Sequence, residues 1–146
     1  MWTEAVKRWV ERPQDVITWT LSKLPREQWP YVSSANGEHV AVGPAGIFCL
    51  HEAAELPEIP GPHTHRVHAQ TRRISDELLA ETGQRVWPTV VGVLPGDSLD
   101  DGRVRFGVHY VCGDHLLRWL LTRPAEVEPA ARVRWADVLS AVGQSA

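Results

Sequence analysis

The sequence has almost no lysine. Fifteen of its 146 residues are basic, but only Lys7 and Lys23 are lysines, and the other thirteen are arginines. A GC-rich coding bias is the simplest cause of such an excess. The distribution excludes any mechanism that needs a lysine side chain after residue 23.

A strong net charge is also missing. Eighteen acidic residues against fifteen basic ones give a formal charge of -3. So small a charge excludes a strong overall field that would draw the protein to nucleic acid or to an acidic membrane. Any contact with DNA must therefore come from a local cluster of basic side chains.

Cysteines and long apolar runs are scarce as well. Cys49 and Cys112 are the only cysteines, and each lies in an apolar, strand-like run where a reduced thiol is buried as a small hydrophobe. No stretch approaches the roughly eighteen apolar residues of a membrane span, and the start of the chain lacks the apolar core of a signal peptide. We therefore expect a cytoplasmic protein with no membrane partner.

A chain of 146 residues is close to the usual size of one domain. Hydrophobic periodicity and turn residues predict helices over 3–11, 65–82 and 113–121 and strands over 16–23, 38–43, 46–52, 85–94 and 103–112. A helix that crosses between strands implies a mixed β-sheet flanked by helices, so the predicted fold class is α/β. We place one domain at 1–124, followed by a linker and a C-terminal amphipathic helix at 125–146.

Four ionisable side chains lie at the ends of a predicted hairpin, residues 36–53, which read NGEHVAVGPAGIFCLHEA. Pairing outward from the Gly-Pro-Ala-Gly turn puts Glu38 opposite His51 on one face and His39 near Glu52 on the other. A cross-strand ion pair or hydrogen bond between Glu38 and His51 would be worth about 0.2–1 kcal/mol. His39 is expected to be a satisfied structural group.

The segment EHVAVGPAGIF resembles the central motif of the nuclease-related domain (NERD) family. In that family an isoleucine-aspartate-histidine triplet leads an apolar strand, a Gly-Pro-x-Gly turn follows, and the second strand ends in an acid-x-lysine triplet. The resemblance extends from about Trp19 to Pro124. It implies the core of the PD-(D/E)xK nuclease-like superfamily, which is a helix, three strands, a helix and a strand.

Carried over residue by residue, the resemblance puts the metal-binding aspartate on Glu38, the second acid on His51 and the lysine on Ala53. Gln70 on the second helix also lies where a site residue is expected. The resemblance thus implies Glu38, His51 and Gln70 as catalytic positions, and Glu38 with His51 as metal ligands. Since Mg²⁺ prefers several oxygen ligands, these two make a weak site. We expect no cofactor, or Mg²⁺ or Mn²⁺ if the domain is active.

Loss of the acid-x-lysine triplet predicts a catalytically inactive module that binds DNA or a protein. One alternative is an active, divergent, metal-dependent DNA nuclease that uses Glu38, His51, Gln70 and a helix arginine. Another is an interaction subunit of a larger assembly with no nucleic-acid role, which binds through its terminal helices. Trp2 and Trp135, near the chain ends, are the expected interface anchors in that case.

Arginines cluster on the second predicted helix at Arg66, Arg72 and Arg73, and again at Arg103 and Arg105. Helix arginines usually form a solvated face. In the superfamily that the hairpin resembles, however, the second helix borders the DNA cleft. The resemblance therefore implies that Arg66, Arg72 and Arg73 contact nucleic-acid phosphates.

Three histidines, His63, His65 and His68, lie within six residues at the start of the second helix. His65 and His68 are close enough to share a zinc ion, but no CxxC or HExxH pattern supports such a site. A solvated, pH-sensitive helix start is the other interpretation. Cys112 and His115 do not make a nucleophile pair, because their side chains are expected to point in unrelated directions.

Overall fold

A six-stranded mixed β-sheet forms the centre of the molecule. The computed structural model describes residues 13–96 and 103–145. In spatial order the strands are β1 (Tyr31–Ser33), β2 (His39–Gly43), β3 (Gly46–Glu52), β4 (Thr89–Leu94), β6 (Val108–Cys112) and β5 (Arg103–Arg105). The inner strands β3, β4 and β6 run parallel, and the remaining pairs are antiparallel.

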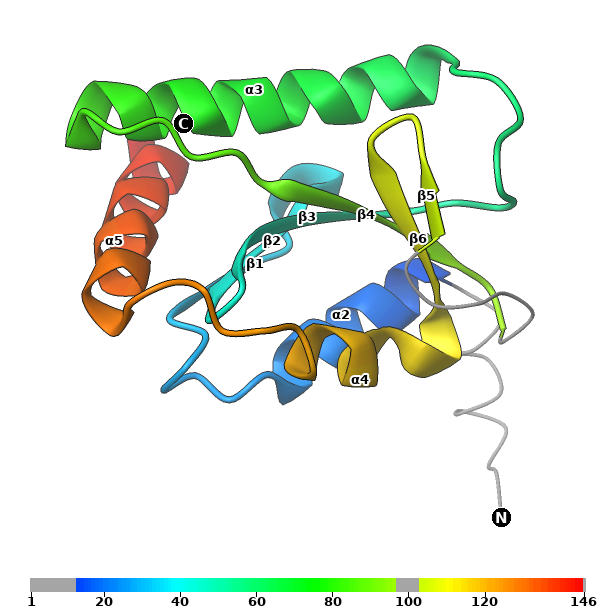
Figure 1. The fold of residues 1–146 in the computed structure, drawn as a ribbon, viewed down its shortest axis with the longest axis horizontal. Coiled ribbons are helices and arrows are strands. Elements are labelled where there is room, and N and C mark those ends of the chain that lie inside the picture. The colour runs from blue at the N-terminus through cyan, green and yellow to red at the C-terminus, as the bar shows by residue number, and fades with distance from the viewer. Residues whose placement is uncertain (1–12, 97–102, 146) are drawn as a thin grey trace.

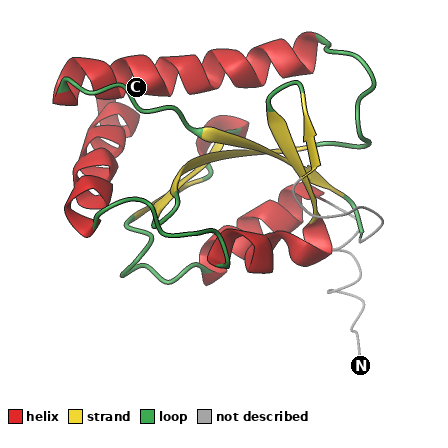
Figure 2. Ribbon diagram, viewed as in Figure 1, coloured by secondary structure: helices red, strands yellow, loops and turns green. Residues whose placement is uncertain are grey.

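Helices cover both faces of this sheet. Four helices are described: α2 (Pro13–Lys23), α3 (Pro62–Thr82), α4 (Leu116–Leu121) and α5 (Pro129–Ser145). Figure 1 shows α3 and α5 on one face and α2 and α4 on the other, and Figure 2 shows the strands between them. The predicted α/β class with a mixed sheet flanked by helices is therefore confirmed. Among the helices of residues 13–96 and 103–145, none has the length and apolar character needed to span a bilayer.

The predicted hairpin is confirmed as strands β2 and β3. Its register runs from Val42 opposite Ile47 outward to His39 opposite Leu50. Side chains then alternate as expected, so Ile47 and Cys49 face α3 and α5, while Leu50 faces α2. This register determines on which face of the sheet each hairpin side chain lies.

The strand predicted at 16–23 is wrong, because these residues belong to helix α2. They are rich in β-branched side chains, which favoured a strand. However, Val16, Ile17, Leu21 and Leu24 are buried, and they recur at intervals that place them on one side of a helix. Burial of this apolar stripe against the sheet outweighs the local preference for a strand.

Two other sequence predictions are corrected in the same way. Residues 31–33, predicted as loop, form edge strand β1. Residues 103–112, predicted as one strand, fold into the β5–β6 hairpin. The chain reverses at Phe106 and Gly107, whose φ angles are 52° and 77°.

The long helix α3 confirms the predicted helix at 65–82 and begins slightly earlier, at Pro62. Gly83 ends it in the left-handed conformation, with φ 74°, and donates its N–H to the carbonyl of Leu79 at 2.9 Å. The strand predicted over 85–94 is present from Thr89 onward as the buried strand β4. Helix α3 therefore connects the parallel strands β3 and β4 and lies across the sheet.

The C-terminal helix α5 packs on the core. Trp135 and Leu139 join the cluster formed by Val42, Ile47 and other residues of the α3 face. Trp135 is only 8% exposed, so its predicted role as an interface anchor is wrong. The preceding linker is held to the hairpin turn, because two of its N–H groups donate to the Pro44 carbonyl. Trp2 and the helix predicted at 3–11 lie outside the described residues.

Candidate functional site

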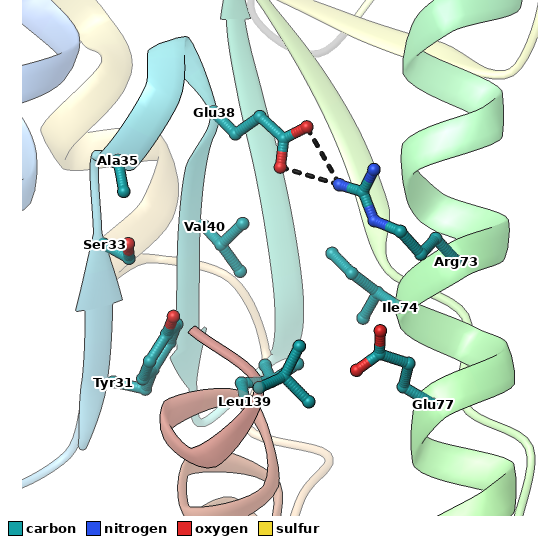
Figure 3. A pocket seen from close by; sticks show the side chains of 10 residues that line it. Tyr31, Ser33, Ala35, Glu38, Val40, Arg73, Ile74, Glu77 and Leu139 are labelled. Atoms are coloured by element: carbon teal, nitrogen blue, oxygen red, sulfur yellow. Dashed lines mark hydrogen bonds and ion pairs between the residues drawn. The ribbon is translucent and has the colours of Figure 1, made fainter. Parts of the chain in front are cut away.

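Glu38, the first of the candidate site residues, is bound to an arginine. Glu38 follows a short 3-10 turn, η1 (Ala35–Gly37), and lies just before β2. The Arg73 guanidinium of α3 donates to both Glu38 carboxylate oxygens, at 2.8 and 2.7 Å. Figure 3 shows this pair at one end of a cleft. The ion pair raises the pKa of Arg73 further.

His51 is partly buried beneath α3, and its ring bonds to no described side chain. Both of its ring nitrogens are inaccessible, and neither has a hydrogen-bond partner among the described residues. The His63 ring packs edge-on against it, with the ring centroids 4.5 Å apart. Burial, together with the nearby His63 and His68, lowers the pKa of His51 to about 4. His51 is therefore a neutral imidazole at pH 7.

The expected cross-strand pair between Glu38 and His51 is wrong. The β2–β3 ladder ends at His39 and Leu50, and Glu38 turns toward α3 to meet Arg73. A hydrogen bond to a guanidinium with good geometry satisfies the carboxylate better than a buried, neutral imidazole can. Glu38 and His51 thus lie on the same side of the sheet without contact between their polar atoms.

Gln70 is another partly buried polar residue of α3. It lies two turns after His63, and its amide nitrogen is buried without a partner among the described residues. On the sheet below, Cys49 is a buried free thiol. Its pKa is raised to about 12, mainly by burial and also by Glu38, although Arg73 acts in the opposite direction. Cys49 is therefore an apolar neighbour of the site and no nucleophile.

These side chains do not fit an Mg²⁺ or Mn²⁺ ion of the nuclease type. Such an ion prefers an octahedral set of oxygen ligands, usually with two carboxylates from the protein. Here Glu38 is held by a cation, and the second position carries the buried imidazole of His51. Within the described ranges, no three histidine, cysteine or acidic side chains are placed to bind one metal ion.

A cleft opens beside the Glu38–Arg73 pair and has a volume of about 430 Å³. Strands β1 and β2 form its floor with Tyr31, Ser33 and Val40, and helices α3 and α5 supply its walls, including Ile74 and Leu139 (Figure 3). Val40, Ile74 and Leu139 are nearly buried. The cleft is thus mostly apolar inside, with charged side chains at its rim. Sequence reasoning missed Tyr31 and Ser33, because their segment was predicted as loop.

The three histidines of α3 have separate roles. His63 packs on His51, and His65 is exposed. His68 donates from Nε2 to the Phe106 carbonyl at 2.7 Å, which fixes the helix to the β5–β6 turn. The shared zinc site proposed for His65 and His68 has no third ligand within the described part of the chain.

On the opposite face of the sheet, His39 is a structural group, as expected. It is 4% exposed, and a hydrogen bond of 2.9 Å joins its Nδ1 to the Ser34 hydroxyl. Burial lowers its pKa, and the nearby Glu52 opposes that effect. His39 therefore fastens the start of β2 to the segment before it and takes no part in the α3 face.

The expected nucleic-acid contacts divide into two kinds. Arg73 is engaged by Glu38, whereas Arg66 and Arg72 are exposed on α3, and Arg66 also donates to His63 Nδ1 at 3.4 Å. His68 ties α3 to the β5–β6 turn, so β5 lies close to this helix (Figure 1). The fold thus brings together two arginine-bearing segments that are far apart in sequence.

Compared with known proteins by sequence and by structure, the chain matches no family model, no curated protein and no solved structure.

Proposed function

We propose that this protein is a NERD-like domain with a PD-(D/E)xK nuclease core that binds nucleic acid and does not cleave it. The element order of the described residues supports the core, since it runs from helix α2 through three strands to helix α3 and strand β4. This order agrees with the one the resemblance implies, although the first described strand, β1, is not the strand predicted at 16–23. A cytoplasmic location belongs to the proposal, because neither Cys49 nor Cys112 forms a disulfide.

The Glu38–Arg73 ion pair is the observation that carries the proposal. A nuclease of this kind needs its carboxylate to bind a metal ion. Here the Glu38 carboxylate already accepts two hydrogen bonds from the Arg73 guanidinium. At the lysine position, Ala53 packs against the apolar cluster of α3 and β6. Of the three groups that a nuclease needs, the first carboxylate is occupied by Arg73, the second acid is replaced by His51, and the lysine is replaced by Ala53.

A cleavage assay tests the missing activity. We expect no nicking of supercoiled plasmid above the buffer background with Mg²⁺ or Mn²⁺, for the wild-type protein and for Glu38→Ala alike. Glu77→Ala is a matched control, because Glu77 lines the same cleft without bonding to Arg73. Cutting by the wild type and by Glu77→Ala that disappears in Glu38→Ala would show an active nuclease.

Binding is expected to depend on the exposed arginines of α3. Arg66 and Arg72 lie on a part of α3 that has no acidic side chain before Asp76. Replacing both with glutamine should weaken DNA binding at least tenfold at low salt and lower the slope of log K against log salt by about two. Fluorescence anisotropy with a labelled oligonucleotide measures both quantities.

The control variant also loses two positive charges, but on a different part of the surface. Arg26 follows α2 and Arg134 lies on α5, and both side chains are exposed. The Arg26→Gln, Arg134→Gln protein should bind DNA within about twofold of the wild type. Equal weakening by the two double variants would mean that net charge, and no particular surface, governs binding.

A further inference from the structure

The turn between β5 and β6 has an unusual residue at its tip. Arg105 pairs with Val108, so Phe106 and Gly107 form a two-residue turn, and both have positive φ. This is the type I′ pattern, which favours Asn-Gly or Asp-Gly. A bulky aromatic residue in the left-handed region is an outlier that costs folding free energy. Phenylalanine is therefore an energetically unfavourable residue for the backbone conformation at the tip.

The tip is held in place by α3. His68 donates to the Phe106 carbonyl at 2.7 Å, and a Cβ at position 107 would lie 3.0 Å from the His68 ring. Gly107 thus allows the helix and the turn to approach closely. The Phe106 side chain, by contrast, is 39% exposed. The turn is fixed in position while its aromatic ring faces solvent.

Basic side chains lie on the two segments that form and hold this turn. Residues 62–75 and 103–113 contain five arginines and no aspartate or glutamate, although Arg73 is paired with Glu38 and Arg105 donates to the Pro57 carbonyl at 2.8 Å. Arg103 and Arg105 pair across the ladder with Tyr110 and Val108, which pack with Val67, so both arginines lie on the α3 face.

Helix α3 supplies another basic group close to the turn. Arg72 is four residues beyond His68 and therefore lies about 6 Å from it on the same side of the helix. Its side chain is exposed. Cations thus lie on two sides of the Phe106 tip, one set from β5 and one from α3.

Two other exposed aromatic side chains are already covered by cations. Lys23 lies 5.8 Å from the centre of the Trp19 ring, and the Arg85 guanidinium lies 5.4 Å from that of Trp87. In the described part of the chain, no ring or cation contact involves Phe106. An exposed ring between arginines has the chemistry that binds single strands, because bases stack on the ring while cations bind phosphates.

We propose that Phe106 is a stacking platform for a base of single-stranded nucleic acid, with Arg103 and Arg72 as phosphate contacts. This inference rests on the nucleic-acid binding proposed above and names the form of nucleic acid that is bound. Duplex offers no free base face to an aromatic ring at a hairpin tip. Single strands should therefore bind more tightly than duplex of the same length.

The variant Phe106→Asn separates stacking from folding. Asparagine suits the positive φ at this position, so the midpoint of urea unfolding should stay the same or rise. Affinity for a labelled oligo-dT strand should nevertheless fall about tenfold, in line with the loss of one stacked base. A merely structural role for Phe106 does not produce this combination of retained stability and lost binding.

Two further variants complete the test. Phe106→Trp should retain or improve binding to oligo-dT, and Trp87→Ala, which removes an exposed aromatic on another segment, should bind like the wild type. If Phe106→Asn binds oligo-dT as tightly as the wild type, or if the protein prefers duplex, the proposed stacking role of Phe106 is wrong. Either result leaves the proposed nucleic-acid binding unaffected. Absence of binding to every oligonucleotide overturns both, and binding to anionic vesicles instead would assign the tip to membranes.

Discussion

Lowering the pH from 7 to 4 is expected to reduce the free energy of unfolding by about 3 kcal/mol through His51 alone. Burial and the neighbouring His63 and His68 lower the pKa of His51 to about 4, whereas a histidine in an unfolded chain titrates near its ordinary value of 6.5. The unfolded state therefore takes up a proton first. This stability is fully present above pH 6.5 and is lost as the pH falls toward 4.

Two other histidines act in the same direction. Burial lowers the pKa of His39 and of His109, and Arg123 adds to the effect at His109. The groups that face His51 itself are His63 and His68 from α3 and the Tyr110 ring from β6. None of them is an acid that would favour an imidazolium. Acidification should therefore destabilise the folded protein on both faces of the sheet.

The variant His51→Leu tests this account. Leucine removes two buried ring nitrogens that no described group bonds, each worth about 1–3 kcal/mol when unsatisfied, so stability at pH 7.5 should not fall. Between pH 6.5 and 4 the variant should lose about 3 kcal/mol less than the wild type. Urea unfolding followed by tryptophan fluorescence measures both values. His65→Leu, on the exposed side of α3, is the control and should keep the wild-type pH dependence. If the free energy of unfolding changed equally with pH in all three proteins, the prediction would be wrong.

Gly43→Ala is expected to lower the free energy of unfolding by about 3 kcal/mol. A Cβ at position 43 would lie 2.3–2.6 Å from three atoms of the Trp29 ring, well inside van der Waals contact. Trp29 is 1% exposed and packs on Phe48, with the ring centroids 5.8 Å apart, so it has no room to withdraw. The first glycine of the hairpin turn is thus required by a tryptophan in the preceding loop.

The matched control is Gly61→Ala at the start of α3. No atom lies within 4 Å of a Cβ built there, and the φ of −136° suits any residue. This variant should stay within about 1 kcal/mol of the wild type, since only capping preference changes. Chemical denaturation of the two variants measures the difference. Similar stabilities for both would show that the Trp29 contact relaxes without cost.

The hairpin and α3 were predictable because their signals are local. Alternation around a glycine turn fixes the β2–β3 register, and the stripe containing Val67, Ile74 and Leu78 predicts the buried side of a long helix. Helix α2 was missed because its β-branched residues favour a strand, whereas the spacing of its apolar residues favours a helix. Packing of the apolar residues on the sheet stabilises the helix. The Phe106–Gly107 turn was missed because phenylalanine is not a residue that type I′ turns favour.

The site was only partly predictable for a different reason. Strand alternation correctly placed His51 on the face away from His39, and the resemblance selected Glu38 and Gln70 on that same face. The partner of Glu38 was not predictable from the hairpin, since Arg73 is 35 residues away and reaches it only because α3 crosses the sheet. The packing of His63 on His51 likewise depends on where α3 begins.

The short edges of the sheet have a consequence for self-association. The long apolar strands β3 and β4 lie inside, and the two outer strands, β1 and β5, are three residues each. A short edge offers few unpaired backbone groups to another chain, and two arginines on β5 repel a second copy aligned beside it. Arg103, which we assign to a phosphate, therefore also disfavours edge-to-edge pairing of β5 with a second copy.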